Sequence, residues 1–229
     1  FEQQLSASSI YSSFYLQAGN VENRGIELSV NYNKEFLNKQ LAWNSTLTYS
    51  RNVNEIKELV RGYRNPFTGE LFDITEVRKG STVLREGGSM SDVVVRGVLL
   101  RDANGDLIEE ASQYKFDKTQ EVKLGRSTPD FQMGWRNTLS YKGIDLSFLF
   151  NGSFGGIVLA GTQPMLDAYG VSKASADARD NRGVVVNGKK YDAQKYYNTI
   201  KDLPGYYSYD ATNVRLQEVS LNYTIDGKH

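Results

Sequence analysis

Residues 131–150 read FQMGWRNTLSYKGIDLSFLF. On both sides of Lys142-Gly143 a large apolar side chain occupies nearly every second position, and a period of two indicates β-strands. A two-residue turn at Lys142-Gly143 creates facing pairs that are apolar on both sides, namely Tyr141 with Ile144, Leu139 with Leu146, and Trp135 with Phe150. Facing residues share one face of a sheet. Turn length and side-chain pattern therefore predict the same antiparallel hairpin.

The same alternation marks further strands before and after this hairpin. Residues 26–32 carry apolar side chains at even positions and residues 41–49 carry them mostly at odd positions, so residues 33–40 are expected to connect a second hairpin. Near the end of the chain, residues 219–225 alternate, whereas Val214 and Leu216 keep the opposite parity. A β-bulge near Gln217 would reconcile these two runs.

Two long connections help to decide which kind of β-protein this is. Residues 52–130 and 152–213 are long, polar and punctuated by glycine, and compact soluble domains rarely contain such connections. Outer-membrane barrels alternate short periplasmic turns with long extracellular loops. Aromatic rings toward the predicted strand ends would suit a membrane interface: Tyr32, Tyr49, Phe131, Tyr141 and Phe150. We therefore expect strands that span an outer membrane.

The first long connection contains one more candidate hairpin, over residues 93–108. Val93 to Leu100 is strongly apolar, and Asp102 to Asp106 reads as a turn that contains Asn-Gly. Because the connection leaves and re-enters the sheet at the same end, it crosses the membrane either twice or not at all, and both remain open. Residues 102–106 also suggest calcium, but the spacing departs from an EF-hand loop, so we favour a plain turn and expect no metal.

Composition excludes several functions. The 229 residues have a formal net charge of zero, which gives no basic face for nucleic acid. No apolar run reaches the roughly 18 residues that a transmembrane helix needs. The chain has no cysteine, its single histidine is His229, and no phosphate loop or nucleophile motif occurs. Glu109 and Glu110 would point to opposite faces of a strand. We expect neither an enzyme nor a cofactor.

Three tyrosines are candidate contact residues. Tyr206, Tyr207 and Tyr209 could form an exposed aromatic platform for a sugar ring or a partner, and packing within the loop is the alternative use of the same rings. Short helices are expected over residues 172–179 and 191–197, capped by Ser172 and Asp192. The polar face of the strands carries Glu27, Arg136 and Asp145, which would line the interior of a barrel.

Four segments of the chain complete the sequence evidence. They read NVENRGIEL at residues 20–28, LGRSTPDF at 124–131, YKGIDLS at 141–147 and YDATNVRLQEVSLNY at 209–223. In this order and spacing they resemble the SusC/RagA family of TonB-dependent transporters of Bacteroidetes-type bacteria. The resemblance implies an all-β fold, a partial antiparallel transmembrane β-barrel that forms one curved sheet, with long extracellular loops carrying short helices.

The resemblance also implies a location and partners. Residues 1–229 would be an internal slice of one barrel of roughly 22 strands, without the plug domain and the final strands. Outer-membrane lipid would surround it, a SusD-like surface lipoprotein would deliver an oligosaccharide or peptide, and TonB would act through the missing N-terminal region. The alternative is a soluble β-sandwich, as in a carbohydrate-binding or adhesin module, which would bury the apolar face between two sheets. A β-rich glycosidase is a third choice.

Overall fold

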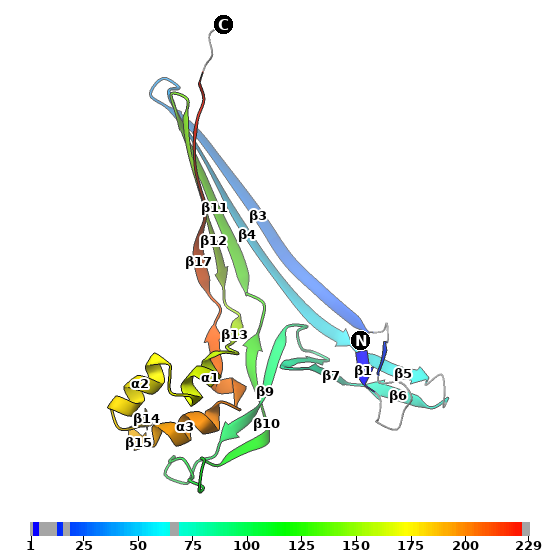
Figure 1. The fold of residues 1–229 in the computed structure, drawn as a ribbon. Coiled ribbons are helices and arrows are strands. Elements are labelled where there is room, and N and C mark those ends of the chain that lie inside the picture. The colour runs from blue at the N-terminus through cyan, green and yellow to red at the C-terminus, as the bar shows by residue number, and fades with distance from the viewer. Residues whose placement is uncertain (1, 5–12, 16–18, 65–68, 226–229) are drawn as a thin grey trace.

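The computed structural model describes residues 2–4, 13–15, 19–64 and 69–225. Its main feature is one antiparallel sheet of five strands in the order β17-β12-β11-β4-β3, which forms the long stem in Figure 1. The strands are β3 (Asn20–Phe36), β4 (Leu41–Glu58), β11 (Phe131–Tyr141), β12 (Ile144–Phe154) and β17 (Asn213–Tyr223). Neighbouring strands are joined at one end by tight turns and at the other by large connections.

The β11–β12 hairpin has the predicted register. Tyr141 faces Ile144, and the pairing continues without interruption to Phe131 and Phe154. Lys142 and Gly143 both have positive φ, at 48° and 80°. This is the backbone conformation of a type I′ turn, whose twist matches that of the flanking strands. The two-residue turn read from the sequence is therefore confirmed.

The β3–β4 hairpin is longer than the sequence predicted. β3 continues to Phe36, which pairs with Leu41, so the turn comprises residues 37–40 and not residues 33–40. At the other end β4 continues past Asn52 to Glu58, where the sequence predicted a connection. The prediction was wrong at both ends because these extensions are mostly polar, and Val53 and Ile56 in the extension of β4 have opposite parity, so they give no period-two signal.

The apolar face of the sheet is bare. Leu221 is 70% exposed, Ile26 59%, Trp135 43% and Leu146 38%, while Trp43 is half-buried. In the described part of the chain no second sheet covers these side chains, so the sandwich alternative is wrong. The 11 residues of β11 correspond to a membrane thickness of about 25 Å if the strand rises about 3.3 Å per residue and tilts by about 40°. Dimensions and face both suit a membrane-spanning wall.

The large connections fold into a second region, the loop body (residues 59–64, 69–130 and 155–212), at the lower end of the sheet in Figure 1. Its strands are β5 (Val60–Arg64), β6 (Leu71–Ile74), β7 (Glu76–Lys79), β8 (Thr82–Arg85), β9 (Asp92–Leu99), β10 (Phe116–Arg126), β13 (Ile157–Leu159), β14 (Val184–Val186), β15 (Lys189–Tyr191) and β16 (Ser208–Asp210). β1 (Glu2–Gln4) and β2 (Ser13–Tyr15) form a separate pair. A four-stranded sheet, β10-β9-β8-β7, is the largest in the loop body.

The candidate hairpin over residues 93–108 belongs to this loop body. β9 pairs with β10 along most of its length, and the Arg101–Leu107 bridge closes the predicted turn at 102–106. In its described part, the connection between β4 and β11 therefore lies in the loop body and adds no strand to the five-stranded sheet. Val93 to Val95 form a continuous apolar run because all three are buried in the loop body, unlike the strands of the stem.

Helices complete the loop body. They are α1 (Gln163–Ala168), α2 (Lys173–Asp180), α3 (Ala193–Ile200) and the short 3-10 helix η1 (Pro204–Tyr207). The predicted caps are confirmed, since Ser172 accepts from the Ser175 amide and Asp192 from the Lys195 amide. None of the helices in the described ranges is long and apolar enough to cross a membrane. The core comprises Leu99, Leu107, Tyr114, Tyr191, Ile200, Leu203 and Tyr207.

Candidate functional site

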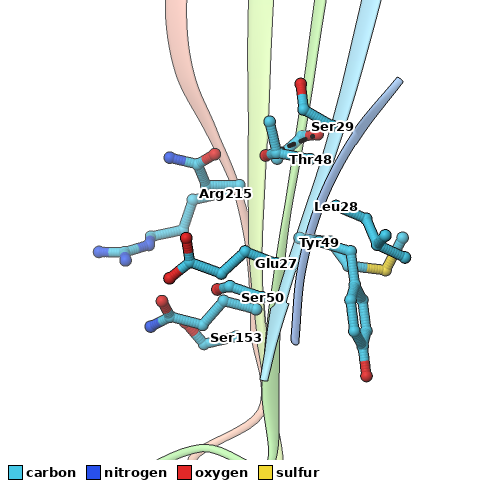
Figure 2. Close-up of a pocket in the computed structure, with 13 residues that line it drawn as sticks. Glu27, Leu28, Ser29, Thr48, Tyr49, Ser50, Ser153 and Arg215 are labelled. Atoms are coloured by element: carbon cyan, nitrogen blue, oxygen red, sulfur yellow. Dashed lines mark hydrogen bonds between the residues drawn. The ribbon is translucent and has the colours of Figure 1, made fainter. Parts of the chain in front are cut away.

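The polar face of the five-stranded sheet contains a hollow near the loop body. It has a volume of about 440 Å³ and is lined by residues of all five strands. Strand register brings Glu27, Ser50, Gln132 and Ser153 into one row on this face. Figure 2 shows Glu27, Ser50 and Ser153 on one side of the strands, while Leu28 and Tyr49 project to the other. The alternation read from the sequence therefore separates a polar surface from an apolar one.

A glycine creates part of the hollow. Gly134 lies on the polar face, and a Cβ at this position would come within 2.7 Å of the Thr48 hydroxyl and 3.0 Å of the Asn151 side-chain oxygen. No side chain fits there without displacing one of these groups. The missing side chain leaves a depression bordered by hydroxyl and amide groups, which can exchange hydrogen bonds with a passing polar solute.

The β-bulge in β17 adds charge to the same face. Leu149 pairs with Glu218 and Phe150 with Leu216, so Gln217 is the extra residue, as the sequence predicted. In a regular strand, residues three apart point to opposite faces. The bulge instead places Arg215 and Glu218 together on the polar face, where Glu218 accepts a hydrogen bond from Arg136 at 3.0 Å. Arg215 and Glu27 both border the hollow, which thus offers one cation and one anion.

The other two polar-face residues identified from the sequence lie outside this hollow. Arg136 is committed to the ion pair with Glu218. Asp145 lies near the tight turn, facing Ser140 and Asn222 on the neighbouring strands. Sequence reasoning identified Glu27 but missed Arg215. The predicted bulge could have identified Arg215. A bulge at Gln217 shifts the in–out alternation of β17 by one residue, so that Arg215 points to the polar face.

The three candidate tyrosines do not form one exposed platform. Tyr207 is only 2% exposed and packs in the core of the loop body, so for this ring the alternative, packing within the loop, holds. Burial raises the pKa of the Tyr207 hydroxyl, which therefore stays protonated. Tyr206 and Tyr209 are 38% and 48% exposed. The Tyr206 hydroxyl accepts from the Leu99 amide, so this ring is also anchored to β9.

The turn at residues 102–106 is held by its own side chains. The Asp102 carboxylate accepts from the amides of Asn104 and Asp106, both at 2.9 Å. Asp106 forms an ion pair with Lys189 at 2.7 Å, and this hydrogen bond holds the pKa of Asp106 below its ordinary value. Carboxylate oxygens of Asp102 and Asp106 thus have protein partners, and these hydrogen bonds are typical of a plain turn.

Among the described residues, the two adjacent glutamates considered from the sequence have separate partners. Glu109 pairs with Lys195 at 3.2 Å, while Glu110 accepts from Gln113. His229 lies outside the described residues. Within the described ranges there is no group of three or more His, Cys, Asp or Glu side chains that could hold a metal.

The five-stranded sheet has a bare apolar face, a polar opposite face and large connections at one end. These features define a segment of an outer-membrane β-barrel. Curated relatives support this class. The chain is 28% identical over 98% of its length to TonB-dependent receptor P3 of Formosa agariphila, and 31% identical over 63% of its length to TonB-dependent receptor P26 of the same organism. It spans 24% and 16% of those proteins, respectively. No family model matches the sequence.

Solved structures have the same fold. The RagAB peptide transporter matches with a TM-score of 0.68 at 16% identity, over 96% of this chain and 24% of that chain. The RagAB peptide importer in the open-open state matches with a TM-score of 0.61, also at 16% identity, over 97% of this chain and 24% of that chain. In sequence the chain is similar to TonB-dependent receptors, and in fold it is similar to the RagAB transporter. Both likenesses agree with the SusC/RagA resemblance and with a location in the outer membrane. These relatives are receptors and transporters, not enzymes.

Proposed function

We propose that the chain forms part of the wall of an outer-membrane transporter that imports a glycan or peptide nutrient in a TonB-dependent manner. The observation that carries this proposal is the hollow on the polar face, where Glu27, Arg215 and several hydroxyl and amide groups surround Gly134. A solute moving through the barrel would exchange water for these groups. Their mixture of charge and neutral polarity suits weak, reversible contact.

The remaining parts of the transporter would come from outside this chain. β3 and β17 are the edges of the described sheet, and unpaired strand edges are costly in lipid, at several kcal/mol for each unsatisfied backbone group. We infer that residues 1–229 belong to one barrel domain that further strands close. A plug domain would fill the interior, and TonB would act through a segment N-terminal to the barrel.

A SusD-like surface lipoprotein is the proposed partner at the loop body. The loop body lies at the end of the sheet with the large connections, which is the extracellular end in outer-membrane barrels. Tyr206 and Tyr209 expose part of their rings there and remain the candidate residues for contact with substrate or partner. The RagAB protein of similar fold is a peptide transporter, which supports a peptide as the substrate here. A glycan is the other substrate class that we propose.

Thiol labelling of the intact receptor in cells tests the proposal. Because residues 1–229 contain no cysteine, Ser153→Cys and Val214→Cys place matched thiols on the polar and apolar faces of paired strands. A bulky, water-soluble maleimide should react with the first and block growth on the nutrient. It should leave the second unlabelled and growth unchanged.

Growth on different nutrients distinguishes the class of substrate from the question whether the substrate passes through this part of the barrel. Cells are grown on a peptide digest or on an oligosaccharide mixture as the required nutrient, with the receptor as the uptake route. Arg215→Gln should slow uptake severalfold, with Val214→Leu on the neighbouring outward position as the matched control. Growth on both nutrients that is unaffected by maleimide at Ser153→Cys would overturn the import proposal.

A further inference from the structure

The helices α1, α2 and α3 of the loop body contact one another and border a pocket of about 530 Å³. They lie together at one side of the loop body in Figure 1. The volume falls within the range of small-ligand sites, roughly 300 to 1,000 Å³. The pocket shares no lining residue with the hollow on the polar face of the sheet, so it is a separate feature of the molecule. We call it the helix pocket.

Two arginines at the end of α2 line the helix pocket. They are Arg179, in the last turn of the helix, and Arg182, just after it. The chain between them is fixed, because the Arg182 amide donates to the Arg179 carbonyl at 3.0 Å and the Gly183 amide to the Ala178 carbonyl at 2.7 Å. Arg179 Nη1 lies 3.9 Å from the position that a Cβ at Gly170 would take. This guanidinium therefore extends from α2 toward the end of α1.

Neither guanidinium has a partner in the part of the chain that the structure describes. No acidic side chain there lies within ion-pair distance of Arg179 or Arg182, and neither side chain forms a hydrogen bond. Elsewhere in the loop body, Arg85 and Arg96 both pair with Glu121. A guanidinium presents five N–H donors in a planar fork that matches a carboxylate. The helix pocket therefore has free donors for a planar anion.

The two carboxylates that line the helix pocket already have partners. Asp167 is 5% exposed and accepts from the Gln163 side-chain amide at 2.8 Å. Asp192 caps α3 and accepts from the Lys195 amide at 2.7 Å. A carboxylate has about four lone-pair sites, so both can also accept hydrogen bonds from a ligand. Hydroxyl donors suit them, because an ammonium would add a third positive charge beside the two arginines.

Two tyrosines add ring surfaces to the helix pocket. Tyr169 is 75% exposed, whereas Tyr197 is half-buried. Burial and the Asp167 carboxylate raise the pKa of the Tyr197 hydroxyl, which therefore stays protonated and can donate. An exposed tyrosine ring offers an apolar surface with a polar tip, which suits contact with the face of a sugar ring.

We propose that the helix pocket binds a uronate residue of an acidic oligosaccharide. The uronate carboxylate pairs with Arg179 and Arg182. Its hydroxyls donate to Asp167 and Asp192, and one face of its ring packs on Tyr169. A neutral sugar leaves the guanidiniums without a counter-ion, and a peptide carboxyl terminus lacks both the hydroxyls and the ring. The role of the pocket in uptake rests on the proposed import, but its ligand is argued from the pocket itself.

Isothermal titration calorimetry of the complete receptor in detergent tests the site without any transport step. The probes are the trimers of galacturonate and of mannuronate, and the methyl esters of both, which keep the rings and remove the charge. At least one acid should bind, with one site per receptor, at least about tenfold more tightly than its ester. Arg179→Gln and Arg182→Gln should each weaken this binding about tenfold, the effect of a lost charge-assisted hydrogen bond. Tyr169→Ala should weaken it about threefold.

Matched controls separate this site from general effects of charge and surface. Lys173→Gln removes a cation of α2 that lies outside the pocket and is 88% exposed. Met165→Ala shortens an exposed side chain of α1 that also lies outside the pocket. Both variants should bind the acid like the original protein.

Three results would overturn the proposal. They are no binding of either acid, equal binding of acid and ester, and equal binding by the arginine variants and the controls. Trialanine with a free carboxyl terminus is the competing probe. If it bound as tightly as the acids and were lost in the same variants, the pocket would be a peptide site and the proposal would also fail. Failure here together with a maleimide block at Ser153→Cys would leave the import proposal standing.

Discussion

The five-stranded sheet and the loop body differ in how far their apolar side chains are exposed. In the sheet, Val30 is 62% exposed and Leu221 70%, whereas Tyr114 and Leu203 in the loop body have no exposed surface. Both regions are built from the same kinds of residue. The difference teaches that the loop body forms its own core against water, while the sheet has its apolar side chains turned toward a medium that is itself apolar.

Truncation in the loop body should give the largest effect. Leu203→Ala removes a fully buried side chain from the core and should lower the free energy of unfolding of this region by about 2 to 5 kcal/mol. Leu221→Ala in the sheet should change it little, because the lost contacts are with lipid. Hydrogen exchange of the receptor in a bilayer measures both. Equal losses for the two variants would contradict the comparison.

A charge on the bare face of the sheet should have a similar but slightly smaller effect. Leu146→Arg places a cation on the lipid-facing side, two residues into β12 from its start at Ile144. Such a cation costs about 2 to 4 kcal/mol at the membrane midplane and less toward the interface, and it should impair barrel assembly. Ser147→Arg places the same cation one residue further on, facing the interior, and should assemble. Heat-modifiable migration on gels reports the folded fraction. Normal assembly of Leu146→Arg would mean that the face is assigned wrongly.

Two tryptophans on the apolar face provide a finer contrast. Trp43 donates to Asn137, which is 2% exposed, and Trp135 donates to Ser45, each at 3.0 Å. Trp43→Phe leaves the buried Asn137 oxygen without this donor and should cost about 1 to 3 kcal/mol. Trp135→Phe should cost less, since Ser45 is only partly buried. Denaturant unfolding of the complete receptor compares them, and the reverse order would contradict the assignment.

The smallest expected effect concerns pH in the loop body. Glu121 accepts from Arg85 and Arg96, and these contacts hold its pKa below the ordinary value of 4.5. A lowered carboxyl pKa contributes stability that is complete above 4.5 and is lost as the pH falls through the lowered value. The protection factors of the β9 and β10 amides, which are corrected for the intrinsic pH dependence of exchange, should therefore be constant above 4.5 and fall below it. Glu121→Gln should reduce this dependence, and an unchanged acid response in that variant would refute it.

The sequence was most informative about the sheet. Its alternation and the short Lys142-Gly143 turn determine the β11–β12 register, because a shift by one residue would turn every apolar side chain to the polar face. Most of the loop body could not be predicted. β9 pairs with β10 across the intervening residues 100–115, and nothing in the local pattern selects a partner at that separation.

The candidate site was predictable only in part. Alternation identified Glu27 as a polar-face residue. The hollow itself depends on the absence of a side chain at Gly134 between Thr48 and Asn151, which are neighbours only after three strands have paired. Likewise, Tyr207 looks equivalent to Tyr206 and Tyr209 in the sequence, and only tertiary packing distinguishes the buried ring from the exposed ones.

A nitroxide scan of β17 in the bilayer-embedded receptor tests the central claim most directly. Spin labels at successive positions from 213 to 223 report access to oxygen, which concentrates in lipid, and to a water-soluble nickel complex. We predict oxygen maxima at Val214, Leu216, Val219 and Leu221, nickel maxima between them, and a break in phase at Gln217. Low access to both reagents at those four positions would show protein packed against them and would contradict a lipid-facing wall.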